Sequence, residues 1–304
     1  MKVADMHCDT VSRLYFNRKF SLCDAPFHVN EKKLRAGGYV LQNFAIFMAR
    51  CGVPLFQMCQ EMLDLFDREV LECADGLAMA RSFADIQRNL AEGKISAVLT
   101  VEDGAAVEGR LERLSYLYDR GVRMLTLTWN FRNELAAPNQ NDAGDRDCRQ
   151  EGLTALGIQA LEEMERLGII ADVSHLSDAG FWDVCRHAKR PFAASHSSAR
   201  ALCGHRRNLT DDMLRALADR GGIAGVNFYG PFLGQEPPSL AAAAKHVRHM
   251  VQAAGENGVA LGSDFDGIED SGAFIDAGHM QCFPEALRQA GLTERQIEKV
   301  MYQN

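Results

Sequence analysis

The sequence has no long apolar run and no basic stripe. Nowhere along its 304 residues does a hydrophobic stretch approach the roughly 20 residues that cross a bilayer, and the opening MKVAD already carries charge, unlike a secretory leader. The 33 basic residues are outnumbered by 41 acidic ones, which gives a net charge of −8. Because polyanion binders need clustered positive charge, we expect neither nucleic acid nor a membrane as a partner.

Cysteine pairs at metal-type or redox-type spacing are also missing. The nine cysteines are odd in number and scattered, with no CxxC pair, so neither a disulfide framework nor a thiolate zinc site is predicted. A reducing compartment fits this pattern, and we expect a cytoplasmic protein. The 8 prolines are dispersed, and no linker or short repeat divides the chain, so a single domain over residues 1–304 is expected.

What is present is an ordinary globular composition, 47% hydrophobic and 24% charged, arranged as a repeating pattern of strand, turn and amphipathic helix. Such alternation is typical of parallel βα units. The chain therefore predicts an α/β fold, a (β/α)8 TIM barrel. The eight strand-like runs are Val3–Met6, Tyr39–Phe47, Ile95–Val101, Arg123–Thr128, Ile169–Val173, Pro191–Ala194, Gly222–Phe228 and Val259–Gly262.

Between these runs, apolar residues return at spacings of three and four, which predicts helices. The helical stretches are Leu111–Arg120, Gly157–Leu167, Ala179–Lys189, Thr210–Arg220 and Leu240–Asn257. The polar segment Asn130–Gln150 interrupts this pattern. An insertion after a strand is a candidate substrate loop or lid.

Residue types that bind metals stand at the carboxyl ends of several predicted strands. The first run leads into His7-Cys8-Asp9, and in an extended segment residues two apart share a side, so His7 and Asp9 can hold one ion. Such a tripeptide alone is weak evidence, because two solvated polar groups at a strand end give the same pattern. Glu102 closes the third run, where a carboxylate could equally cap the next helix.

Two histidines strengthen the metal interpretation. His175 follows the fifth run and His196 the sixth, so both reach equivalent positions of successive βα units. The carboxyl ends of all the strands meet at one mouth of the barrel, so these side chains are expected to lie close together. Three imidazoles with two carboxylates suit two zinc ions. Five ligands can serve two ions only if one is shared, and Glu102 is the expected bridge, with a shared hydroxide in a remaining position. Asp264, after the eighth run, would move protons there, whereas Asp266 is a turn residue.

The sequence resembles the membrane (renal) dipeptidase family, zinc peptidases with an amidohydrolase-like barrel, along nearly its whole length. The matching segments are His7-Cys8-Asp9-Thr10, Glu102-Asp103-Gly104, Arg123–Thr128, Asp172–Ser177, Ser195–Ala199, Arg206–Asp211 and Gly262–Gly267. The resemblance implies hydrolysis of dipeptides, L-D dipeptides included, with two zinc ions per chain. It assigns His7 and Asp9 to one ion, His175 and His196 to the other, and Glu102 to both.

The resemblance also assigns substrate contacts and an assembly. Arg207 matches the arginine that holds the free carboxylate of the dipeptide, and Asp264 matches the acid that shuttles the proton. An arginine fork suits a carboxylate, although the adjacent Arg206 could fill this role instead. A homodimer is the assembly common in the family. Family members carry a histidine after the LTLT run, where this chain has Trp129, so a changed substrate contact is expected there. The chain also ends at Asn304, where family members usually continue.

Two other functions stay open on the sequence. One is a metal-dependent hydrolase of the same barrel that acts on another amide, a lactone or a phosphoester. The other is a non-catalytic binding protein that keeps the fold. We assign no role to the remaining histidines, and we expect His246 and His249 to be exposed on an outer helix. Cys8 and Cys203 are expected to be structural thiols.

Overall fold

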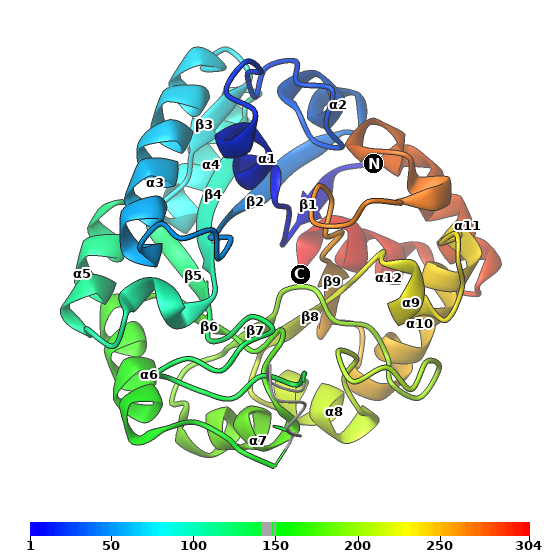
Figure 1. The fold of residues 1–304 in the computed structure, drawn as a ribbon. Coiled ribbons are helices and arrows are strands. Elements are labelled where there is room, and N and C mark those ends of the chain that lie inside the picture. Colours follow the sequence, from blue (N-terminus) through cyan, green and yellow to red (C-terminus); the bar gives the residue numbers. More distant parts are fainter. Residues whose placement is uncertain (141–147, 149) are drawn as a thin grey trace.

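Parallel strands close into a barrel at the centre of the molecule, and helices surround it (Figure 1). The computed structural model describes residues 1–140, 148 and 150–304. The strands in this part of the chain are β1 (Val3–Asp5), β2 (Tyr39–Phe47), β3 (Leu77–Met79), β4 (Ile95–Glu102), β5 (Val122–Thr126), β6 (Ile170–Asp172), β7 (Ala193–Ala194), β8 (Ile223–Val226) and β9 (Val259–Leu261).

The barrel closes between β2 and β4, and the eight strands of the ring are those predicted from the sequence. The order runs β2-β1-β9-β8-β7-β6-β5-β4, and β2 pairs with β4 over seven residues from Leu41↔Ser96 to Phe47↔Glu102. The (β/α)8 prediction is therefore confirmed. The sequence missed β3, which pairs with the first residues of β4 at Leu77↔Ile95, while β5 pairs with β4 only from Leu99 onward. β3 lies outside the eight-stranded ring, so the repeat of eight strands gave no place for it.

Helices follow the strands of the barrel and cover it from outside (Figure 1). The α-helices of the described residues are α1 (Thr10–Phe16), α2 (Glu31–Ala36), α3 (Leu55–Glu72), α4 (Phe83–Ala91), α5 (Glu112–Asp119), α6 (Ala155–Leu167), α7 (Asp178–His187), α8 (Asp211–Asp219), α9 (Gly230–Leu233), α10 (Leu240–Ala254), α11 (Phe283–Gln289) and α12 (Glu294–Glu298). Short turns of other helix types are η1 (Gly104–Val107), η2 (Gly272–Phe274), η3 (Ala277–Cys282) and the π-helix η4 (Lys299–Gln303).

Hydroxyl side chains begin the helices that follow the middle strands. Thr154, Ser177 and Thr210 each accept a hydrogen bond from the backbone N–H three residues later, at the first turns of α6, α7 and α8. Each such cap stabilises its helix by about 1 kcal/mol. These local signals lie in the sequence, which is why the predicted helices agree with the observed ones within a few residues.

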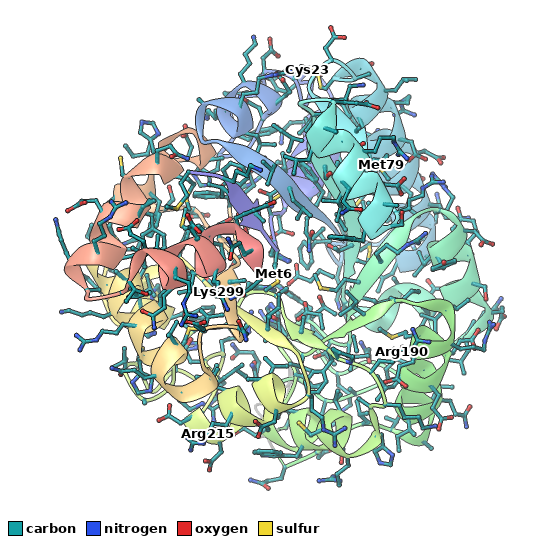
Figure 2. All side chains as sticks on the ribbon, turned by 180° about the vertical axis from the view of Figure 1, so that it is seen from behind. Met6, Cys23, Met79, Arg190, Arg215 and Lys299 are labelled. Atoms are coloured by element: carbon teal, nitrogen blue, oxygen red, sulfur yellow. A yellow bond between two sulfur atoms is a disulfide. The ribbon has the colours of Figure 1, made fainter. Side chains whose placement is uncertain are left out.

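The last residues of the chain cover the amino-terminal end of the barrel. The η4 segment packs against β1 and β9, and the Asn304 side chain donates to the Val259 carbonyl oxygen at 2.7 Å. Figure 2, seen from behind, shows Lys299 beside Met6 at the centre of this end. The carboxyl ends of the strands therefore open on the opposite side. Among the described residues, no helix is both long and apolar enough to cross a membrane.

The insertion after β5 is partly built into the core. Leu135, Ala136 and Ala137 are fully buried, and Ala136 bridges to Leu153. This part therefore packs as a fixed layer beside the barrel. The remainder of the predicted lid, residues 141–147 and 149, lies outside the described residues.

The cysteine prediction was wrong for one pair. Cys23 and Cys73 form a disulfide across 50 residues, with Cα atoms 5.5 Å apart. The pairing arises because the segment after α1 packs beside the end of α3, where Glu69 accepts a hydrogen bond from the Leu22 N–H. Spacing along the chain carries no signal for such a contact. Since disulfides are typical of oxidising compartments, the cysteine argument for a reducing compartment loses its basis.

His246 is buried, which corrects the expectation that it is exposed. Only 2% of this residue is accessible on α10, and its Nδ1 accepts a hydrogen bond from the Ala199 N–H at 3.1 Å. The pKa of His246 is lowered to about 4, mainly by burial and to a smaller extent by His249, while a hydrogen bond to the Leu233 backbone acts in the opposite direction. His249 is half-buried and lies 2.7 Å from an Asp211 carboxylate oxygen. His246 thus joins α10 to the loop after β7 as a neutral ring.

This buried ring predicts a pH-dependent stability. Between pH 6.5 and 4 the unfolded chain binds a proton at His246 that the folded chain does not, so the free energy of unfolding falls with falling pH. The pKa difference corresponds to about 3 kcal/mol. We expect metal-free wild-type protein to lose about 3 kcal/mol more than His246→Asn between pH 7 and pH 4 in urea titrations. Parallel pH profiles for the two proteins would contradict the assignment.

Candidate metal centre

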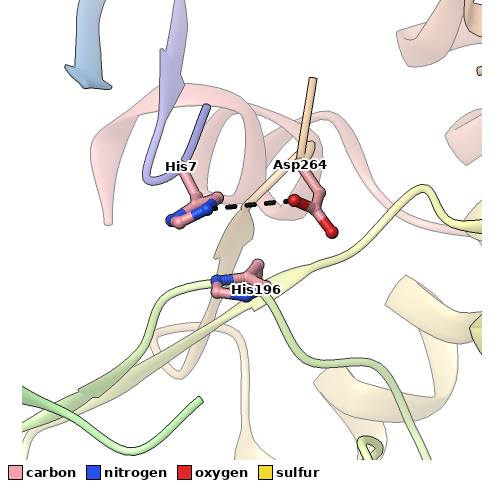
Figure 3. Close-up of side chains that lie close together, drawn as sticks. All are labelled: His7, His196 and Asp264. Atoms are coloured by element: carbon pink, nitrogen blue, oxygen red, sulfur yellow. Dashed lines mark ion pairs between the residues drawn. The ribbon is translucent and has the colours of Figure 1, made fainter. Parts of the chain in front are cut away.

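The residues predicted to bind metal all stand where strands of the barrel end. Parallel strands direct their carboxyl ends to one side of a barrel, so short segments after them share one mouth. His7 and Asp9 follow β1, Glu102 is the last residue of β4, His175 follows β6, His196 follows β7, and Asp264 follows β9. Figure 3 shows three of these side chains, which come from distant parts of the chain and point toward one another.

The five predicted ligands form two overlapping groups around one carboxylate. His7 Nε2 lies 3.3 Å from Asp9 Oδ2 and 3.7 Å from Glu102 Oε2. The other oxygen, Glu102 Oε1, lies 3.0 Å from His175 Nε2 and 3.5 Å from His196 Nε2. In each group the ligand atoms lie within 4.8 Å of one another. One oxygen of Glu102 therefore faces each group.

Asp264, which follows the strand next to β1, lies close to a histidine of each group. Its Oδ1 lies 3.8 Å from His7 Nε2, and its Oδ2 accepts a hydrogen bond from Asn227 Nδ2 at 2.8 Å. His7, His196 and Asp264 also satisfy the distances of a ligand group, so geometry alone permits Asp264 to be either a ligand or a free carboxylate (Figure 3). The sequence did not identify Asn227, because an asparagine after a strand carries no distinctive spacing.

The buried charges of the centre favour the binding of a cation. Burial raises the pKa of the Glu102 carboxyl well above its usual value, and the neighbouring Asp9 carboxylate adds to this effect. Burial opposes a charge on His7, yet Glu102 and Asp9 together raise the pKa of His7 to about 10. Burial lowers the pKa of His175 and His196 well below the usual value, so both rings are neutral, the form that binds metals.

A buried carboxylate oxygen without a partner also fits a cation. Asp9 Oδ1 is fully enclosed and accepts no hydrogen bond from any described residue. An unpaired buried oxygen is costly, and a metal ion would satisfy it. Together with three imidazoles and a shared carboxylate, this donor set fits zinc-like ions.

The backbone is strained at several of these positions. Asp103, His175, Asp264 and Asp266 have φ between 64° and 87°, a region that non-glycine residues seldom adopt. Such strain concentrates at functional sites, where the surrounding structure holds it in place. Asp266 lies in a turn, as predicted, and its carboxylate accepts hydrogen bonds from Thr10 Oγ1 and the His28 N–H, both at 2.6 Å.

Arg207 reaches the same cavity from the loop after β7. It is 2% exposed, and it donates to Ser197 Oγ at 3.3 Å and to the His196 carbonyl oxygen at 3.2 Å. Its Nε is buried and has no acceptor among the described residues. Burial lowers the pKa of Arg207 to about 10, so it remains a cation at neutral pH. Arg206 instead donates to the Asn139 carbonyl oxygen at 3.4 Å, and only Arg207 of the pair lines the cavity.

The cavity above the centre has a volume of about 630 Å³ and an aromatic wall. Trp129 lies 4.8 Å from Phe47 between ring centroids and 6.2 Å from His175. The next residue, Asn130, was not identified from the sequence, although its Oδ1 lies 2.9 Å from His175 Nδ1. Cys8 is buried away from the centre, with its Sγ directed at the Asn43 carbonyl oxygen, as expected of a structural thiol.

Comparison with known proteins finds dipeptidases and metallopeptidases that are similar to this chain. An uncharacterized dipeptidase of Schizosaccharomyces pombe is 32% identical, over 99% of this chain and 78% of its own length. The crystal structure of the metallopeptidase dipeptidase AC, of peptidase family M19, has 26% identity and a TM-score of 0.90 over 99% of this chain and 96% of its own. A metallopeptidase from Rhodobacter sphaeroides, crystallised with a phosphinate mimic of L-Ala-D-Ala, has the same fold, with 24% identity and a TM-score of 0.90 over the same shares.

The family model for membrane dipeptidase, peptidase family M19, matches residues 1–304, the entire sequence. The match includes all the strands that bring the metal-binding residue types together. This chain therefore belongs to the membrane dipeptidase family and is a metallo-dipeptidase.

Proposed function

We propose that this protein is a zinc-dependent dipeptidase that binds two zinc ions per chain. His7 and Asp9 hold one ion, His175 and His196 hold the other, and Glu102 binds both. The observation that carries the proposal is the placement of Glu102, whose two oxygens face two separate groups of imidazoles. When bound, the two ions would supply a shared hydroxide at neutral pH and polarise the peptide carbonyl.

Arg207 binds the free carboxylate of the dipeptide in this proposal. Its unpaired Nε and its buried charge leave a donor and a positive charge that a carboxylate would satisfy. Because the ligand groups lie beside it, a carboxylate anchored there places the adjacent peptide bond over them. This anchor supports short substrates with a free carboxyl terminus.

Asp264 moves the proton. The hydrogen bond from Asn227 fixes one oxygen, Oδ2, and leaves Oδ1 directed at the ligand groups. Burial raises the pKa of Asp264, which brings this carboxyl closer to the range in which a group can both take and give a proton. Asp264 therefore takes the proton of the attacking water and delivers it to the nitrogen of the leaving amine.

Trp129 and Phe47 form the wall along which a substrate side chain packs. Their rings are in contact, and both line the cavity, so apolar side chains are favoured at this wall. The mimic of L-Ala-D-Ala bound by the Rhodobacter sphaeroides relative supports L-D dipeptides as substrates as well.

We further propose one catalytic domain over residues 1–304 and a homodimer. The cytoplasmic location stays a prediction, and the Cys23–Cys73 disulfide weighs against it.

A panel of small substrates tests this function. Zinc-loaded protein is expected to hydrolyse L-Ala-L-Phe, whereas kcat/KM for the corresponding C-terminal amide falls about 100-fold, because the buried Arg207 loses its charged partner. A lactone and a phosphotriester serve as the comparison for another hydrolase of this barrel. Turnover of those two compounds without dipeptide hydrolysis would contradict the peptidase proposal. Absence of both zinc and hydrolysis would favour a binding protein.

A further inference from the structure

Asp172, the last residue of β6, is a buried acceptor for donors at the end of β5 and in the segments that follow β6 and β7. It is fully inaccessible, and its Oδ1 accepts from the backbone N–H groups of Ser174 at 3.0 Å and Ser195 at 2.8 Å. Its Oδ2 accepts from Thr126 Oγ1 at 2.7 Å and from Ser195 Oγ at 2.6 Å. Four donors thus surround one carboxylate below the candidate metal centre. None of the roles assigned above involves Asp172.

The Ser195 hydroxyl connects this carboxylate to a metal-binding histidine. Ser195 Oγ lies 2.7 Å from His196 Nδ1. A hydroxyl has one hydrogen, and the Ser195 hydrogen is directed at Asp172, whose carboxylate can only accept. Ser195 Oγ must therefore accept from its two remaining neighbours, His196 Nδ1 and the Ser174 hydroxyl at 3.2 Å, so the proton of the neutral ring lies on Nδ1. The lone pair then lies on Nε2, the atom that faces Glu102 Oε1 at 3.5 Å.

The contact of the second histidine lacks this constraint. His175 Nδ1 faces the Asn130 side-chain oxygen at 2.9 Å. An amide can turn to present either its oxygen or its nitrogen, so it accommodates either tautomer of the ring. At Nδ1, therefore, the Asp172 carboxylate fixes the proton of His196 through the Ser195 hydroxyl, whereas the Asn130 amide does not fix that of His175.

We propose that Asp172, acting through Ser195, is a positioning residue that holds His196 as the Nδ1–H tautomer with Nε2 directed at a metal ion. The inference rests on the ligand set of the proposed function and adds two residues to it. Carboxylates that orient metal-binding histidines in this way typically contribute 10- to 100-fold in metal affinity, roughly. Since His196 shares its ion with His175, the effect falls on one of the two ions.

The tautomer can be measured in the wild-type protein. Nitrogen NMR of metal-free protein labelled with ¹⁵N-histidine is expected to show His196 protonated on Nδ1 and bare on Nε2, with the signal assigned by its loss in His196→Gln. An Nε2–H tautomer in the metal-free protein would overturn the proposal. This measurement needs neither metal nor activity, so it stands if the dipeptidase proposal fails.

Variants separate positioning from structural support. Ser195→Ala is expected to lower the affinity for one of the two zinc ions about 10- to 100-fold in chelator competition. Ser195→Thr keeps a hydroxyl at this position and is expected to bind zinc within about 3-fold of the wild-type affinity. Thr126→Val is the matched control, because the Thr126 hydroxyl also donates to Asp172 but makes no hydrogen bond to a predicted ligand among the described residues, and valine keeps the backbone pairing of position 126 with Glu102. It lowers the melting temperature and leaves zinc affinity unchanged. Equal zinc affinity in Ser195→Ala and wild type, or equal loss in Ser195→Ala and Thr126→Val, overturns the proposal.

If Ser195→Ala does not fold, the wild-type tautomer decides the question. If wild-type protein binds no zinc, the proposed function fails while the tautomer measurement still tests the Asp172–Ser195 contact. Failure of the function and failure of this inference therefore give different results.

Discussion

Glu102→Gln is expected to lower the zinc content of the purified protein from two ions toward one and to reduce kcat/KM by about 1000-fold or more. An amide keeps the size of the side chain but offers one oxygen, whereas the two oxygens of Glu102 face different ligand groups. The substitution also removes a negative charge from a buried place where two dications are to be held. Metal analysis after dialysis and dipeptide kinetics measure the two effects.

The matched control is Glu112→Gln, the same chemical change at an exposed position on α5. We expect it to keep two zinc ions and full activity. Two tightly bound ions in Glu102→Gln would show that Glu102 does not bridge. If Glu102→Gln retains zinc but loses activity, Glu102 acts in catalysis rather than in metal binding.

Asp264→Asn is expected to lower kcat by about 100- to 10,000-fold while both zinc ions remain. The amide still accepts the hydrogen bond from Asn227 Nδ2, so the side chain keeps its place, but it can no longer take a proton. Because substrate binding depends on Arg207, KM should change little. Steady-state kinetics and metal analysis of the same preparation separate proton transfer from metal binding.

Loss of zinc in this variant would instead make Asp264 a ligand, the other role that its distance from His7 and His196 permits. Asp219→Asn, an exposed change on α8, controls for the removal of one negative charge. Wild-type turnover in Asp264→Asn would remove Asp264 from the mechanism.

Much of the fold could be predicted because its signals are local. The apolar runs of β2 and β4 are nine and eight residues long, and hydroxyl caps mark the starts of α6, α7 and α8. β3, which lies outside the ring, was not part of the repeating pattern and was missed. His246 was placed wrongly because helical spacing identifies the apolar face of a helix but not the backbone groups that a polar ring on that face will meet.

The partners of the site residues were less accessible to prediction. Asn130 and Asn227 each contact a predicted site residue, and Asp172 reaches His196 through Ser195, yet none of the three stands at a spacing that distinguishes it from other polar residues near strand ends. Their roles depend on side-chain directions at distances near 3 Å. Sequence spacing does not specify such directions, because a turn of a few residues after each strand sets them.

The sequence by itself determined the parallel barrel and the residue types at its strand ends, because periodicity, caps and strand order act over short stretches of chain. Only the tertiary structure decided that the two oxygens of Glu102 face different imidazole groups, that Arg207 rather than Arg206 enters the cavity, and that Cys23 meets Cys73. These contacts join residues far apart in the chain. They depend on the closure of the barrel and the register of its strands, which no local pattern encodes.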